Sequence, residues 1–157
     1  LCDSMTAKSL HRNFMGYTTA HTQLMIGLGV SSISDSWTAF AQNVKTIKEY
    51  ERLIDANELP VFKGHFLNKE DQIIRKHILN LMCHFETEWC DTESQLMHFD
   101  DILEKLSELE NDGLCYTEGN KLFVTQPGQK FVRNICMAFD LKLQRKQPDQ
   151  LLFSSTI

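Results

Sequence analysis

The chain has 157 residues, of which 42% are hydrophobic and 24% are charged, and its formal net charge at pH 7 is −5. This composition excludes a disordered chain, and the length suits one domain or the end of one domain joined to a small second one. No apolar run approaches the roughly 18 residues that a membrane-spanning helix needs, so we expect a soluble protein without a membrane partner. The acidic balance argues against a general nucleic-acid binder, because phosphate recognition needs clustered Lys and Arg.

The first part of the chain, to about Ser34, contains two strand-like runs, NFMGYTT from Asn13 and MIGLGVSSIS from Met25. Both runs are rich in Gly, Thr, Ser and β-branched residues, and neither has a helical period. The glycines of GLGVSS do not make a dinucleotide-binding loop, because Ser32 stands where the third glycine would be. We therefore expect Gly27 and Gly29 to serve tight strand packing.

A helix is predicted from Asp35 or Ser36, either of which can cap it. Its apolar positions recur at helical spacing, with Lys and Glu between them: Phe40, Val44, Ile47 and Ile54. The helix should end before ANELPVFKG, where Pro60 cannot continue it and Gly64 supplies a turn. We place a domain boundary there, which gives one domain over residues 1–63 and a second over residues 64–157.

The second part begins with a helix capped by Asn68, with carboxylates in its first turn. Shorter helices are predicted over residues 92–98 and 101–110, followed by a hairpin around TEGN and a last helix that starts near Pro127. The expected buried positions are Ile74, Ile78, Leu81, Met82, Phe85, Leu103, Leu106, Leu109, Phe131, Ile135 and Phe139. The order helix, helix, helix, hairpin, helix is that of a winged helix. The predicted fold class is therefore α+β and mostly helical.

The cysteines lie at positions 2, 83, 90, 115 and 136. An odd number at such wide spacing fits reduced thiols better than a disulfide framework, which predicts a cytoplasmic protein without a visible secretion signal. No Cys or His pair has the spacing of a metal site, and no serine occupies a nucleophile elbow. The chain thus shows no metal site and no catalytic group of its own.

A winged helix raises the alternative of a nucleic-acid-binding or protein-interaction module. The helix over residues 101–110 would enter the major groove, yet it carries Glu104, Glu108 and Glu110 against a single Lys105. These carboxylates would face phosphates, so we expect no nucleic-acid partner.

Five motifs occur in a characteristic order: LHRNFMGYTT, LMIGLGVSSIS, AQN, LMC and RNIC. Together they resemble the C-terminal part of oxygen-independent coproporphyrinogen III oxidase, a family of radical S-adenosylmethionine enzymes. A haem-chaperone branch of the same superfamily has an NYW-type stretch where this chain has RNFMGYTT. The dehydrogenase branch is therefore favoured, and a haem-chaperone relative remains the alternative.

The resemblance implies that residues 1–63 are the last strands and helix of a partial TIM-like barrel, and that residues 64–157 are the winged-helix-like C-terminal domain. It also implies haem biosynthesis, in which the full-length enzyme oxidatively decarboxylates coproporphyrinogen III to protoporphyrinogen IX. Such an enzyme uses S-adenosylmethionine and a [4Fe–4S] cluster held by a CxxxCxxC loop. This chain lacks that loop, so we expect it to need the missing N-terminal barrel. Alone, it should bind no cofactor and be inactive.

The resemblance places three side chains near bound S-adenosylmethionine at the active-site end of the barrel: Phe14, Met15 and Ile33. Some family members have glutamine at the position of Met15, so a hydrogen bond there would be replaced by thioether packing. Arg12 is a weaker candidate, because its guanidinium suits a propionate carboxylate of the substrate.

Overall fold

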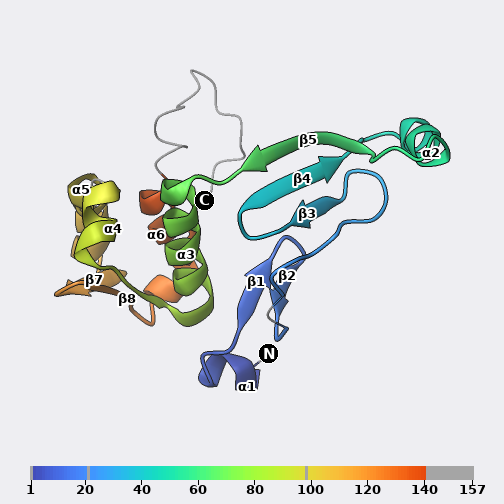
Figure 1. Cartoon of the computed structure of the whole chain (residues 1–157). Coiled ribbons are helices and arrows are strands. Elements are labelled where there is room, and N and C mark those ends of the chain that lie inside the picture. Colours follow the sequence, from blue (N-terminus) through green and yellow to red (C-terminus); the bar gives the residue numbers. More distant parts are fainter. Residues whose placement is uncertain (1, 21, 98, 141–157) are drawn as a thin grey trace. The chain divides into compact units, whose positions relative to one another are not determined.

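The computed structural model describes residues 2–20, 22–97 and 99–140. The chain forms two compact units, residues 1–79 and residues 80–157 (Figure 1). The division falls between Leu79 and Asn80, inside helix α3 (Lys69–His84), because the first turns of this helix contact the sheet of the first unit through Arg75. The domain boundary expected after Lys63 is a separate matter and stays a prediction.

The first unit begins with helix α1 (Cys2–Thr6) and a hairpin of strands β1 (His11–Asn13) and β2 (Gly16–Thr18). The run NFMGYTT is therefore not one extended segment but a turn with two strands, in which Asn13 pairs with Gly16. The side chain of Asn13 accepts a hydrogen bond from the Met15 N–H at 2.8 Å, and Gly16 has a positive φ of 125°. Asn and Gly favour such a turn because an Asn side chain mimics a turn hydrogen bond and Gly tolerates positive φ.

A three-stranded antiparallel sheet follows, in the order β3 (Ile33–Asp35), β4 (Ala39–Asn43) and β5 (Val61–Phe66). The helix predicted from Asp35 is wrong over its first half, since helix α2 spans only Ile47–Asp55. Here β4 pairs with a strand on each side, and these hydrogen bonds override a helical spacing of apolar residues. Gly64 likewise lies inside β5 and not in a turn.

Most of the run MIGLGVSSIS is irregular, with Ile33 and Ser34 in β3 and Met25 in a single bridge to Asp35. A Cβ atom on Gly27 would approach the backbone oxygen of Ile33 to 2.8 Å, which confirms the close packing expected there. Gly29 is required for a different reason, its φ of +93°.

The helices and the hairpin of the second unit follow the predicted order, and strand β6 (Glu86–Glu88) is an element that the sequence did not predict. After α3 come strand β6 and helices α4 (Asp91–Leu96) and α5 (Phe99–Asn111). The hairpin of β7 (Cys115–Glu118) and β8 (Lys121–Val124) leads to a 3-10 turn η1 (Gly128–Phe131) and helix α6 (Val132–Phe139). The antiparallel sheet has the order β6-β8-β7.

The core of the second unit is mainly apolar. Leu106, Ile135 and Phe139 are all 0% exposed, as their spacing predicts, whereas Phe131 is 44% exposed because it ends the 3-10 turn before α6 begins. The ring of Phe99 lies between those of Trp89 and Phe139, at centroid distances of 4.4 and 5.9 Å. Among the described helices, none is long and apolar enough to cross a membrane.

Candidate functional site

The turn of the β1–β2 hairpin presents Phe14 and Met15. The Phe14 side chain is 52% exposed, and its ring meets the ring of Phe40 on β4 edge to face, with centroids 5.0 Å apart. Met15 is 88% exposed. Two large apolar side chains in a hairpin turn are unusual, because such turns are normally polar, and this suggests a binding role.

One face of the three-stranded sheet is defined by two cross-strand rows. Residues directly opposite each other in antiparallel strands place their side chains on the same face. The register aligns Ile33, Gln42 and Lys63 in one row, and it aligns Asp35, Phe40 and His65 in the other. This face therefore combines an apolar centre with cationic and polar groups from β5.

The residues of these rows other than Asp35, together with Phe14 of the hairpin turn, line a pocket of about 260 Å³, which we call the Phe14 pocket. Its apolar part is formed by Phe14, Ile33 and Phe40, and its polar part includes Gln42, Lys63 and His65. The structure thus brings Phe14 and Ile33, which were singled out in the sequence, to one pocket. Met15 is not among the described residues that line it.

A second pocket, of about 190 Å³, shares Phe14 and Phe40 with the first and is also lined by Arg12, Asn13, Asp35 and Arg75. The Arg12 guanidinium carbon lies 5.8 Å from the ring centroid of Tyr17, within the range of a cation–π contact. Arg12 and Phe14 therefore share a pocket.

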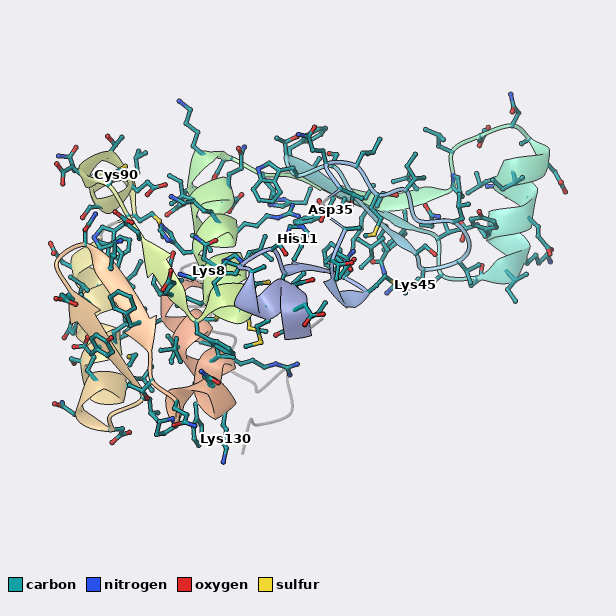
Figure 2. All side chains as sticks on the ribbon, turned by 90° about the horizontal axis from the view of Figure 1, so that it is seen from below. Lys8, His11, Asp35, Lys45, Cys90 and Lys130 are labelled. Carbon is teal, nitrogen blue, oxygen red and sulfur yellow. The ribbon has the colours of Figure 1, made fainter. Side chains whose placement is uncertain are left out.

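A largely buried ion pair between Asp35 and Arg75 lines the second pocket. Arg75 donates from Nη1 to Oδ1 of Asp35 at 2.9 Å and from Nη2 to Oδ2 at 2.5 Å, and it also donates to the Trp37 carbonyl oxygen at 3.1 Å. Asp35, labelled in Figure 2, is 8% exposed. The guanidinium carbon lies 4.6 Å from the Trp37 ring centroid and 4.9 Å from that of Phe40. Arg75 thereby fixes the ring on which Phe14 rests.

Sequence reasoning missed this pair, because Asp35 was interpreted as a possible helix cap and Arg75 belongs to no motif. The two residues are 40 positions apart, and only the fold brings them together. The Trp37 turn gives no sequence signal either, since Trp37 adopts a φ of 63° that non-glycine residues rarely take.

The described residues do not fit an iron–sulfur cluster or another metal. Within residues 2–20, 22–97 and 99–140, no group of three or more His, Cys, Asp or Glu side chains is placed to hold a metal ion. Cys83, Cys115 and Cys136 are buried thiols that form no disulfide, and Cys90 is exposed. Burial, reinforced by the nearby Glu110 carboxylate, raises the pKa of the Cys115 thiol to about 11.

The comparisons with known proteins concern nearly the whole chain. No protein-family model matches it. A coproporphyrinogen III oxidase structure from Escherichia coli, described as a radical SAM enzyme, superimposes with a TM-score of 0.81 at 34% identity, over 90% of this chain and 34% of that one. The oxygen-independent coproporphyrinogen III oxidase of Escherichia coli is 38% identical over 142 residues, and that of Synechocystis is 39% identical over 157 residues. The chain is a homologue of the oxygen-independent coproporphyrinogen III oxidases.

This homology confirms the resemblance drawn from the five sequence motifs. The matches cover 87% and 94% of this chain but only 31% and 34% of the two oxidases, so the chain spans about a third of the length of these relatives. The mixture of helices and sheets agrees with the radical SAM structure that it superimposes on. Phe14, Met15, Ile33 and Arg12 remain predicted site residues.

Proposed function

We propose that this chain is the C-terminal part of an oxygen-independent coproporphyrinogen III oxidase that works in haem biosynthesis in the cytoplasm. The full-length enzyme would oxidatively decarboxylate coproporphyrinogen III to protoporphyrinogen IX. The observation that carries the proposal is the superposition on the Escherichia coli enzyme, with a TM-score of 0.81 over 90% of the chain. Fold and sequence agree over the same residues, which distinguishes this match from a shared fold alone.

In this proposal the first unit completes the wall of a radical SAM barrel. Its described strands pair only antiparallel with one another, so the parallel pairs of a barrel would come from the missing N-terminal segment. Exposed apolar side chains in this unit would be covered there: Leu24, Ile26, Leu28, Leu59, Phe62 and Phe66. The second unit would be the winged-helix-like domain, as its β7–β8 hairpin between α5 and α6 suggests.

The residues present fit part of the implied cofactor set. The Phe14 pocket has the apolar rings and aliphatic side chain that pack against an adenosyl group, so Phe14 and Ile33 would orient S-adenosylmethionine. Met15 would add a thioether contact from the same turn. When bound, the cofactor together with a [4Fe–4S] cluster supplies one-electron chemistry. The cluster would be held entirely by the missing segment.

The chain's own residues would therefore position the cofactor and the substrate and shield them from water, and they would move no proton. Phe14 and Phe40 would exclude water from the reacting groups, and the Asp35–Arg75 pair would keep the Phe40 ring in place. Arg12 would meet a propionate of coproporphyrinogen III in the second pocket.

Complementation of a bacterial strain that cannot make haem without oxygen tests this proposal. The gene for the longer protein should restore anaerobic growth without added haem. The same gene truncated before Leu1, and the segment encoding this chain alone, should both fail, because each lacks part of the barrel. Failure of a stably expressed, cluster-containing longer protein to restore growth would contradict the proposed function. A haem-induced Soret shift in that protein would favour the haem-chaperone alternative.

A further inference from the structure

We propose that Lys63 binds a carboxylate of the ligand seated in the Phe14 pocket. The inference rests on the proposed function and extends it, since it assigns a recognition role to a residue on β5. Tetrapyrroles that carry propionates combine an apolar ring system with carboxylates. The pocket offers the matching combination of aromatic rings and one cation.

The sheet register places Lys63 on the same face as the apolar residues. Lys63 lies opposite Gln42 on β4, and Gln42 lies opposite Ile33 on β3, so the three side chains form one row beside Phe40. All of them line the pocket together with Phe14. Neighbouring strands of a sheet lie about 5 Å apart. A ligand that packs against Phe14 and Phe40 is thus within one strand spacing of the Lys63 side chain.

The other charged groups near this face are already engaged. Arg75 is paired with Asp35, and His65 Nε2 lies 3.4 Å from an Asp71 carboxylate oxygen. Lys63, in contrast, has no carboxylate within salt-bridge distance among the described residues, and no described Asp or Glu lines the pocket. Its ammonium is therefore available to an incoming anion.

Lysine chemistry suits such a role. The ammonium is a compact point charge on a flexible stem, so it can follow a carboxylate whose position varies with ring orientation. The pocket volume of about 260 Å³ is smaller than that of pockets that enclose a whole drug-sized ligand. The pocket would therefore hold one part of a tetrapyrrole with its side chain. A carboxylate of this kind could come from a propionate of the substrate or from the aminoacyl end of S-adenosylmethionine.

Variants of the longer enzyme test the assignment. Lys63→Gln removes the charge, Lys63→Arg keeps it, and Lys48→Gln makes the same charge change at an exposed position on α2, outside the Phe14 pocket. The first readout is the dissociation constant of coproporphyrin III, a stable oxidised analogue of the substrate, which is measured by its fluorescence. The second is the dissociation constant of S-adenosylmethionine, measured by dialysis. The third is the pair of KM and kcat for coproporphyrinogen III.

We expect Lys63→Gln to weaken one carboxylate ligand about tenfold, because hydrogen bonds to charged groups contribute on that order. Lys63→Arg should restore most of the affinity, and Lys48→Gln should bind like wild type. A loss confined to coproporphyrin III and its KM assigns the propionate, and a loss confined to S-adenosylmethionine assigns the aminoacyl carboxylate.

The failures of the two proposals are distinguishable. Wild-type affinity for both ligands in Lys63→Gln, with an active parent enzyme, would overturn the role of Lys63 and leave the proposed function standing. An equal loss in Lys48→Gln would also overturn it, because the effect would then be one of net charge. A parent enzyme that contains its cluster but neither binds coproporphyrin III nor turns over would overturn the proposed function and the Lys63 assignment with it.

Discussion

Phe14 lines both pockets, as does the Phe40 ring that it contacts. We predict that Phe14→Ala in the longer enzyme lowers kcat/KM at least about tenfold, because lost positioning of a reacting group has effects of this size or more. Its stability should change little, because an edge-to-face ring pair contributes only about 0.5–1.5 kcal/mol. Steady-state kinetics and thermal melting check this, with Phe131→Ala, an exposed aromatic of the second unit that lines neither pocket, as the control. Wild-type kinetics with an intact cluster would contradict the assignment.

The Asp35–Arg75 pair should contribute to the stability of the first unit, because its charges are largely buried. Arg75→Ala leaves the Asp35 carboxylate without its bidentate partner, which should cost about 3–5 kcal/mol of unfolding free energy. The double variant Asp35→Asn/Arg75→Ala should recover part of that loss. Urea unfolding can be followed through Trp37, which contacts Arg75, after Trp89 is changed to Phe. Additive losses in the double variant would show that the pair is not coupled.

The contribution of Cys115 to folding stability should change at alkaline pH. The pKa of Cys115 is raised from 9.0 to about 11 in the folded chain, so the unfolded chain loses this proton at a lower pH than the folded one. Its contribution to stability is therefore complete below pH 9.0 and is lost as the pH rises from 9.0 towards about 11. We predict that Cys115→Ala flattens this part of the stability profile, measured by urea unfolding between these pH values. An unchanged slope would contradict the link to Cys115.

At the scale of elements, helix α5 stabilises the second unit through its buried face. Leu106 is 0% exposed, so Leu106→Ala should lower the unfolding free energy by about 2–5 kcal/mol. Leu96→Ala, at a side chain that is 48% exposed, should cost much less. Trp89 fluorescence reports on this unit, because its ring packs against Phe99 at the start of α5. Equal losses in both variants would show that burial does not decide the effect.

The elements of the two units were predictable to different degrees. In the second unit, caps, apolar spacing and the TEGN turn are local signals, and α3, α4, α5, the β7–β8 hairpin and α6 all lie close to their predicted ranges. In the first unit, β4 was predicted as a helix because its strand identity comes from pairing with β3 and β5, which local periodicity does not contain.

The candidate site divides in the same way. Phe14 and Ile33 were found from motifs that resemble a family, whereas the pocket that unites them depends on the sheet register. Lys63 and Arg75 carried no motif at all. Lys63 was assigned to the end of a domain, and only the pairing of Lys63 with Gln42 places it on the face that Phe40 shares.

At the scale of the whole molecule, the chain corresponds to about a third of the length of its curated relatives. The first unit exposes many large apolar side chains, and every residue of β5 is exposed. An uncovered strand edge with apolar neighbours is prone to pair with other chains, so covering by the rest of the proposed longer protein would favour its native fold. The proposed activity therefore belongs to the longer enzyme.

The most direct test is anaerobic conversion of coproporphyrinogen III by the purified proteins, with S-adenosylmethionine, a reductant and an electron acceptor supplied. Protoporphyrinogen IX is measured by chromatography after oxidation to the porphyrin. We predict that the longer, cluster-containing enzyme forms this product and consumes S-adenosylmethionine, and that this chain alone forms none. Absence of product with the cluster intact, or product formed by this chain alone, would contradict the proposed function.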